Sequence, residues 1–265
     1  MTADFRERPG SDGEHELQER MGTTARAGKF YDEQVLDRLN ARMREFVARQ
    51  EMFFLATSDQ HGGCDSTYRA GPPGFLQVFD DRTLAYPEYR GNGVLASLGN
   101  IVENPHVGML MVDFLQGRIG LHVNGRARIV SDEEMRRARP ELPVDPVPGR
   151  RAQVWVEVTV EEAYIHCAKH IPHLKKVPSE QRGRSWGTDE FKRKGGDFFG
   201  AAAEARDRPP YQPRRRKRRL PSWAQTGQPT PAAKWQRSVE RLLAVRARRQ
   251  PDPEEGDRSF QGWFS

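Results

Sequence analysis

Residues 107–130 read VGMLMVDFLQGRIGLHVNGRARIV, and this stretch decides the fold class. It contains two strand-like segments, residues 107–114 and 119–130, in which valine, isoleucine, leucine and methionine are frequent. Short apolar runs of this kind, bounded by turn residues, are typical of β-strands. The centre of the chain is therefore predicted to be β-structure.

Similar segments lie on both sides of this stretch. Turn-forming residues separate the upstream ones, with GPPG at residues 71–74 as the strongest break, and the downstream one alternates apolar and polar residues. Five to seven short strands with small helical inserts predict a mainly β fold, a closed antiparallel β-barrel with peripheral helices. The further strands are expected at residues 52–58, 64–69, 75–79, 83–86 and 153–160.

Three segments have helical patterns. Residues 31–50 place apolar side chains at helical spacing opposite a charged face, which predicts one amphipathic helix. Residues 93–104 are expected to form a helix that ends before Pro105. Ser131, followed by Glu134, fits a capping box for a short helix over residues 132–138.

The composition argues against membrane-spanning, secreted and disulfide-rich classes of protein. Of the 265 residues, 36% are hydrophobic and 30% are charged, and no run of about 18 apolar residues could form a transmembrane helix. The N-terminus has no apolar segment of the kind that secretory signals carry. Two cysteines, Cys64 and Cys167, cannot build a disulfide framework, so a cytoplasmic location is expected.

The positive charge is concentrated at the C-terminal end. Residues 206–265 hold 15 of the 43 Lys and Arg residues but only 6 of the 37 Asp and Glu residues. The rest of the chain is slightly acidic, which argues against a general nucleic-acid-binding surface there. The Pro- and Gln-rich stretch that holds the basic run 214–219 is expected to be disordered. An amphipathic helix is expected at residues 232–249, followed by an aromatic end with Phe260, Trp263 and Phe264.

Two segments carry candidate ligand-binding residues. Residues 86–100, YPEYRGNGVLASLGN, combine Arg90 with two glycines at the start of a predicted helix, which suits a phosphate cradle. A turn followed by a capped surface helix explains this pattern equally well. In residues 65–74, DSTYRAGPPG, strand alternation places Thr67 and Arg69 on one face and Ser66 and Tyr68 on the other. An ordinary surface salt bridge is the simpler explanation for Arg69.

An ordered series of motifs resembles a known superfamily. The strings STYRAGPPGFLQVFDDRTLAYPEYRGNG, SLGNIVENPHVGMLMVDF and GLHVNGRARIV are similar to those of the pyridoxamine 5′-phosphate oxidase-like, FMN-binding split-barrel proteins. Within that superfamily the chain looks most like a bacterial branch of predicted flavin-nucleotide-binding proteins. The resemblance extends over about residues 15–200, and its specificity lies in the ordered set rather than in any one motif.

The resemblance implies a six-stranded Greek-key split barrel that forms a homodimer with FMN at the interface. The FMN-binding split-barrel domain is assigned to residues 15–200. The residues' own composition and pattern predict a flexible N-terminus (1–14), a disordered basic linker (201–231), and a C-terminal amphipathic helix with an aromatic end (232–265). Backbone groups of residues 86–88 would face the isoalloxazine edge. The implied FMN-binding residues are Ser66, Thr67, Arg69, Tyr86, Pro87, Glu88, Arg90, Asn92 and Ser97.

Two departures from the oxidases argue against vitamin B6 oxidation. The C-terminal strand with Arg and His that holds the substrate phosphate has no counterpart in residues 163–174, and Ala96 and Ser97 replace an adjacent Arg-Lys pair. Residues 166–173, HCAKHIPH, would place His166 and His170 on one face if they were helical, which would suit a metal. No dedicated metal site is expected, because Pro172 interrupts the segment.

The expected function is that of an FMN-dependent oxidoreductase, which transfers a hydride through flavin N5 to or from an unidentified small molecule. The candidate catalytic residues are His122, Lys169 and His170. Three alternatives stay open: a flavin-storage module without turnover, a haem- or deazaflavin-binding barrel, and nucleic-acid association through the basic tail.

Overall fold

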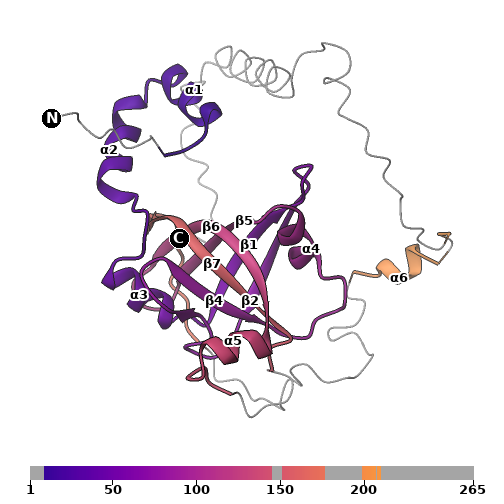
Figure 1. Ribbon diagram of the computed structural model, residues 1–265. Helices are drawn as coiled ribbons and strands as arrows, with labels where there is room; N and C mark the ends of the chain where they lie inside the picture. The colour runs from indigo at the N-terminus through magenta and orange to yellow at the C-terminus, as the bar shows by residue number, and fades with distance from the viewer. Residues whose placement is uncertain (1–8, 145–150, 177–198, 207, 210–265) are drawn as a thin grey trace. The chain divides into compact units, whose positions relative to one another are not determined.

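The computed structural model describes residues 9–144, 151–176, 199–206 and 208–209. The chain divides into two compact units, one with residues 1–10 and 18–189 and one with residues 11–17 and 190–265. The described strands, shown in Figure 1, all lie within the residues of the first unit. They are β1 (Met52–Ser58), β2 (Cys64–Ala70), β3 (Gln77–Val78), β4 (Thr83–Glu88), β5 (His106–Asp113), β6 (Ile119–Ser131) and β7 (Val154–His166).

Within the described residues, six helices accompany the strands. Helix α6 lies in the second unit, and α1 crosses the boundary between the two units. Helix α1 also begins inside the segment 1–14, for which flexibility is expected. The expected linker beyond residue 209 and the C-terminal helix lie outside the described residues, so the division of the chain stays a prediction. The helices are α1 (Asp12–Arg20), α2 (Thr24–Gln34), α3 (Ala41–Ala48), α4 (Ala96–Glu103), α5 (Asp132–Ala138) and α6 (Ala201–Glu204).

The described strands all pair antiparallel in one sheet with the order β2-β1-β5-β6-β7-β4-β3. The mainly β prediction is confirmed, although this sheet has seven described strands rather than six. The expectation of a closed barrel is wrong, because the edge strands β2 and β3 do not pair within the described part of the chain. Strand β3 is only two residues long because Phe75 and Leu76 are buried in the core instead of extending the strand.

The open sheet nevertheless curls around one core. Side chains of β1, β5 and β6 alternate, with Phe53, Met109 and Val123 fully or almost fully buried on the inner face. Phe53 of β1 meets Tyr86 of β4 edge to face across this core, with ring centroids 5.0 Å apart, although the two strands are not neighbours in the sheet. This curl brings the two halves of the sheet together.

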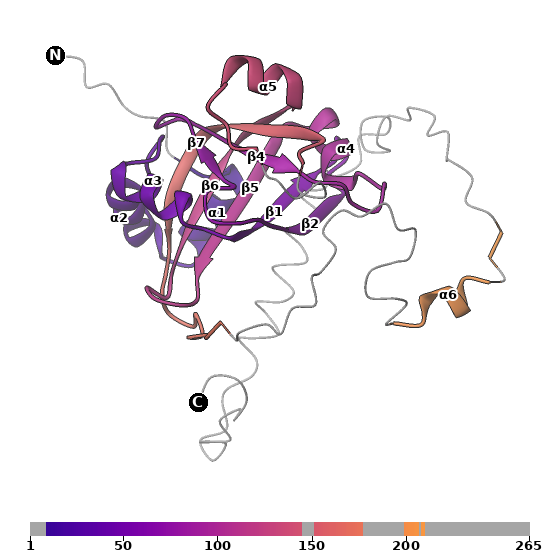
Figure 2. The same ribbon diagram turned by 90° about the horizontal axis from the view of Figure 1, so that it is seen from below.

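A second, smaller core lies under α5. Met135 of α5 packs with Trp155 of β7, and the indole nitrogen of Trp155 donates to Asp132 at 2.8 Å. The predicted cap is confirmed, since Ser131 Oγ accepts from the backbone N–H of Glu134 at 3.1 Å. Figure 2 shows α5 over β7 and β4, on the side away from β1 and β2.

The single helix expected at residues 31–50 is wrong. The chain leaves α2 and forms an isolated bridge in which Leu36 exchanges two backbone hydrogen bonds with Ala163 of β7, at 3.0 and 2.7 Å. A new helix, α3, then begins where Asn40 caps the backbone N–H of Met43 at 2.9 Å. Pairing with the sheet therefore overrides the local helical pattern.

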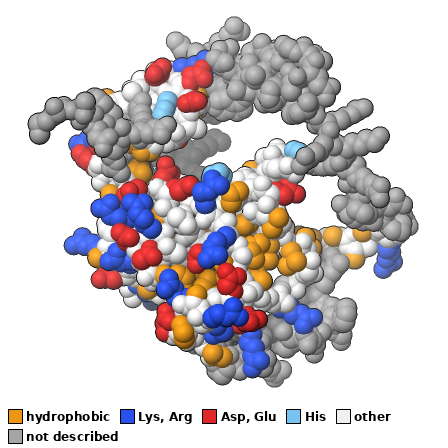
Figure 3. All heavy atoms as spheres, viewed as in Figure 1, with side chains coloured by type: hydrophobic (Ala, Val, Ile, Leu, Met, Phe, Trp, Pro, Cys, Tyr) orange, Lys and Arg blue, Asp and Glu red, His pale blue; other side chains and the backbone are white. Residues whose placement is uncertain are grey.

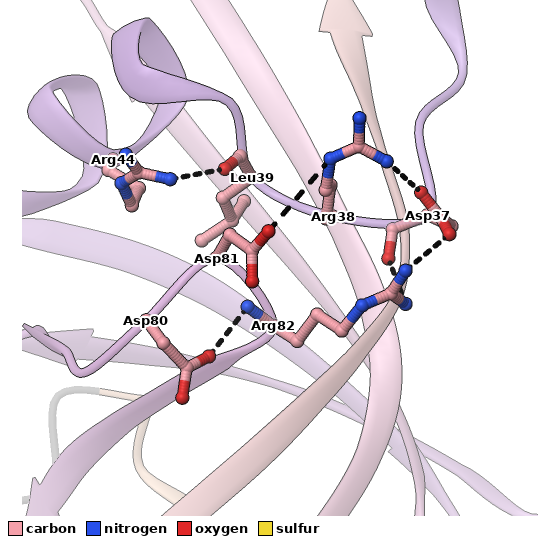
Figure 4. A network of polar contacts seen from close by, with 7 residues as sticks. All are labelled: Asp37, Arg38, Leu39, Arg44, Asp80, Asp81 and Arg82. Atoms are coloured by element: carbon pink, nitrogen blue, oxygen red, sulfur yellow. Dashed lines mark hydrogen bonds and ion pairs between the residues drawn. The ribbon is translucent and has the colours of Figure 1, made fainter.

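Charged side chains surround this connecting segment (Figure 4). Arg82, at the turn before β4, donates to the backbone oxygen of Asp37 at 3.0 Å and pairs with its carboxylate at 2.5 Å. The hydrogen bond and charge of Arg82 lower the pKa of Asp37, and Arg38 faces Asp81 at 3.9 Å. Leu39, at the centre of this network, is fully buried.

Strands β6 and β7, both 13 residues long, form the longest described ladder. The register shifts at Asn124 and Gly125, because Asn124 faces Glu162 whereas Gly125 faces Val160. A Cβ atom on Gly125 would lie 2.1 Å from the backbone oxygen of Thr159. Only glycine fits this bulge without displacing the neighbouring strand. Among the described residues, no helix is long and apolar enough to span a membrane.

We predict that Gly125→Ala lowers the free energy of unfolding by about 1–3 kcal/mol, because the added methyl group collides with backbone rather than with a movable side chain. Gly28→Ala in α2 is the matched control, since nothing lies within 4 Å of its Cβ position. The control should be neutral or slightly stabilising. Urea denaturation of both variants measures the difference, and equal stabilities would contradict the role of the bulge.

We further predict that Leu39→Ala costs about 2–5 kcal/mol, as large-to-small changes in a packed core do. Arg82→Ala should have a much smaller effect, because the Arg82 and Asp37 side chains are 49% and 40% exposed and solvent screens their pair. Thermal denaturation compares the two variants. A larger loss for Arg82→Ala would mean that the charged network, rather than the buried leucine, anchors this segment.

Candidate functional site

Arg69 of β2 lies at the centre of a polar cluster. Its Nε and Nη2 atoms both contact Oε1 of Glu88 from β4, at 2.8 and 2.7 Å. Its Nη1 donates to Thr67 Oγ1 at 2.9 Å and to the backbone oxygen of Tyr68 at 3.2 Å. Two opposite parts of the curled sheet are therefore joined at this guanidinium.

Helix α4 contributes the third element of the cluster. Ser97, which is 4% exposed, accepts from Arg69 Nη2 at 3.3 Å and donates to Asp65 Oδ2 at 3.1 Å. The helix starts after Leu95, whose left-handed backbone (φ 56°) turns the chain into it. Thus β2, β4 and α4 meet around one cation, and we call Asp65, Thr67, Arg69, Glu88 and Ser97 the Arg69 cluster.

The cluster holds one guanidinium and two carboxylates, so it carries a net negative charge when both acids are ionised. Glu88 is only 9% exposed. Burial raises its pKa above the ordinary value, and the charge and hydrogen bond of Arg69 oppose this rise without cancelling it. Burial in the Arg69 cluster therefore disfavours the charged form of Glu88.

Tyr86 and Pro87, which the sequence predicts near a flavin, have buried side chains on opposite faces of β4. Tyr86 belongs to the main core, where its pKa is raised by burial and its hydroxyl has no hydrogen-bond partner among the described residues. Pro87 lines a cavity of about 270 Å³ that Phe75, Tyr89 and Trp155 also line. The side chain of Tyr86 is thus a core residue, which leaves only its backbone for ligand contact.

The remaining predicted ligands lie on the surface. Arg90 and Asn92 are exposed in the turn between β4 and α4, where Asn92 Oδ1 accepts from the N–H of Val94 at 3.0 Å. Ser66 is exposed on the face of β2 opposite to Thr67 and Arg69. The predicted alternation along β2 is confirmed by this burial pattern, and it separates Ser66 from the Arg69 cluster.

His122 lies on the outer face of the sheet. Its Nε2 is 2.9 Å from Nδ1 of His166, and its ring stacks on Tyr164 with centroids 4.7 Å apart. Burial and, to a lesser extent, the charge of His166 lower the pKa of His122. Three strand-to-strand steps separate β6 from β2, about 14 Å. Within one chain His122 and Arg69 are therefore on opposite faces and far apart.

Lys169 and His170 are exposed after the end of β7. His166 is the last residue of β7, and His170 has a positive φ of 72°, so the two histidines do not share a helix face. A helical metal site on this segment is excluded by that geometry. The described residues contain no group of three or more metal-ligating side chains elsewhere either.

One residue and one contact of the observed arrangements were not predicted from the sequence. Asp65 lies two residues before Thr67 on the same strand face, so strand alternation could have added it to the cluster. The pairing of His122 with His166 depends on the β6–β7 register beyond the bulge. No sequence signal reports that register.

Solved structures of three other proteins are similar to this chain at low sequence identity. HupZ of Group A Streptococcus is 21% identical, with 48% of this chain and 92% of that chain covered and a TM-score of 0.34. A putative pyridoxamine 5′-phosphate oxidase from Listeria innocua is 18% identical (47% and 94% covered, TM-score 0.33). HutZ, the haem storage protein from Vibrio cholerae, is 15% identical (49% and 94% covered, TM-score 0.33). No curated protein gives a significant match.

The family comparison covers the strands and the Arg69 cluster. The model described as pyridoxamine 5′-phosphate oxidase matches residues 39–167, from Leu39 beside the charged network to the end of β7. That range contains every described strand of the sheet and every residue of the Arg69 cluster. Residues 39–167 of this chain therefore belong to the pyridoxamine 5′-phosphate oxidase-like superfamily.

Proposed function

We propose that this protein binds FMN and that the Arg69 cluster receives the flavin phosphate. The observation that carries the proposal is the arrangement of Arg69 with the hydroxyl groups of Thr67 and Ser97 at the junction of three elements. A guanidinium fork flanked by hydroxyl groups is a suitable donor set for a phosphate. Glu88 opposes an anion at this place, and its raised pKa offers a way to remove the opposing charge.

FMN, when bound, supplies hydride transfer through its N5 atom, and the substrate would be a small molecule. In this proposal Arg69 binds the phosphate, Thr67 and Ser97 orient it, and backbone groups of residues 86–88 face the ring edge. Arg90 and Asn92 would contribute from the adjacent turn, and Ser66 from the opposite face of β2. His122, Lys169 and His170 are the candidates for moving protons.

We also propose that the protein acts as a homodimer with FMN at the interface. Phe54 and Tyr68 are 40% and 52% exposed, and their rings lie edge to face, 5.9 Å apart, on the outer face of β1 and β2. Figure 3 shows hydrophobic side chains reaching the surface between charged ones on the viewed face of the molecule. A second copy packed on the outer face of β1 and β2 would cover both rings and bring outer-face residues such as His122 close to an Arg69 cluster.

A cytoplasmic location completes the proposal. Cys64 and Cys167 are both free and exposed, which suits a reducing compartment. The basic run 214–219 lies outside the described residues, and we assign no nucleic-acid partner to it.

The identity of the proposed cofactor can be tested directly. The purified protein should show a flavin absorption spectrum, and acid should release FMN rather than riboflavin, haem or a deazaflavin. Arg69→Ala should weaken FMN binding by about 1.5–3 kcal/mol, the range for a hydrogen bond to a charged group. Arg128→Ala is the control, because Arg128 is exposed and pairs with Glu157 away from the cluster.

Several outcomes decide between the candidate functions. Equal FMN affinity in both arginine variants would contradict the site assignment. Release of haem or a deazaflavin would leave the fold assignment unchanged but would contradict FMN as the cofactor. FMN binding without oxidation of reduced nicotinamide or reaction with oxygen would favour flavin storage over an oxidoreductase.

The proposed homodimer can be tested by its self-association in solution. Sedimentation should show a dimer at micromolar concentration, and Tyr68→Lys should shift it towards the monomer, because a charge replaces an aromatic contact at the proposed interface. Met21→Lys is the control, since Met21 is 58% exposed and precedes α2. A monomeric wild-type protein, or a dimer that tolerates Tyr68→Lys, would contradict packing through the outer face.

A further inference from the structure

The guanidinium of Arg69 is fully engaged by its neighbours. Its five N–H groups meet Glu88 twice, Thr67, the backbone oxygen of Tyr68 and Ser97. An incoming anion must therefore displace at least one of these partners. We infer that Glu88 is the displaced partner, and that a phosphate-type anion binds to Arg69 together with a proton that neutralises Glu88. This inference rests on the proposed role of Arg69 as the phosphate ligand.

The chemistry of the partners selects Glu88. Thr67 and Ser97 are hydroxyls, which can rotate and donate to an anion, and the oxygen of Tyr68 belongs to the backbone of β2. Among these partners Glu88 carries the negative charge, so it repels an anion that approaches the same cation. Exchange of one anionic partner for another leaves the charge of the guanidinium compensated.

When Glu88 is released from Arg69, its ionised carboxylate becomes energetically unfavourable. Its side chain is 11% exposed and that of Arg69 20%, so an ionised Glu88 without its partner would be a nearly buried charge beside a bound anion. Protonation removes this penalty. Asp65, held through Ser97, adds a second negative charge to the same cluster and acts in the same direction.

Arg69 is the cation that pairs with Glu88. Arg69 and Asp65 face the cluster from β2, Tyr86 is its neighbour on β4, and α4 contributes the neutral Ser97. Val154 of β7, its partner in the ladder, is apolar. Burial already raises the pKa of Glu88, and loss of Arg69 would raise this pKa further. The shift in pKa between the free and bound protein is what couples the anion to a proton.

Calorimetric titration of the full-length protein tests the inference. Sulfate is the first probe because it does not titrate near neutral pH, FMN is the second, and riboflavin, which has no phosphate, is the control ligand. Titration in buffers of different ionisation enthalpy counts the protons taken up. Sulfate and FMN should each bind with uptake of up to one proton, and affinity should fall by up to about tenfold for each pH unit above the pKa of free Glu88.

Two variants identify the group that takes up the proton. Glu88→Gln should abolish the uptake and bind sulfate more tightly than the wild type at alkaline pH, because the competing charge is gone. Glu157→Gln is the matched control, since Glu157 is also an arginine-paired carboxylate of low exposure (18%) but lies away from the cluster on β7, and it should retain the uptake. Circular dichroism checks that both variants fold.

The infrared difference spectrum of the wild-type protein gives a measurement that needs no variant. Addition of sulfate should produce the band of a protonated carboxyl group. FMN binding without proton uptake, or uptake that persists in Glu88→Gln, would overturn the inference and leave FMN binding intact. Failure to bind FMN at any pH, with proton-coupled sulfate binding retained, would instead overturn the proposed function alone.

Discussion

The pairing of β6 with β7 is the constraint on which the rest of the structure depends. These two 13-residue strands lie at the centre of the sheet, with β5, β1 and β2 on one side and β4 and β3 on the other. The bulge at Gly125 lets the backbones approach closely and increases the local twist. This twist helps the sheet to curl, so that its two halves face one another.

The Arg69–Glu88 ion pair joins two strands, β2 and β4, that are not hydrogen-bonded neighbours in the sheet. Strands β2 and β4 are far apart in sheet order, yet their side chains meet at 2.7 Å because the sheet curls around the core. An ion pair at this position can hold the two halves of the curled sheet together and also exchange one partner for a ligand. A ladder of backbone hydrogen bonds could not be exchanged in that way, which makes this junction the natural place for an anion site.

Local patterns in the sequence predict strands such as β1 and β5 well because most of their buried side chains lie on one face. Alternation alone predicts the buried face of β1, with Phe53 and Leu55, and that of β5, with Met109 and Met111. The helix at residues 31–50 fails because the bridge between Leu36 and Ala163 is a tertiary contact. For the same reason β7 extends beyond residue 160, where Glu161 and Glu162 end the apolar pattern but the partner strand continues.

The candidate site is likewise partly predictable from local patterns and partly dependent on the tertiary fold. Alternation along β2 separates Thr67 and Arg69 from Ser66 without any knowledge of the fold. The contact of Arg69 with Glu88, 19 residues away, depends on how far the sheet curls, and no local pattern contains that information. Alternation along β6 places His122 on the outer face, between the buried Leu121 and Val123, whereas Arg69 lies on the inner face of β2. If inner-face and outer-face residues act on one ligand, two chains must contribute to each site, so self-association would be a condition for chemistry rather than an addition to it.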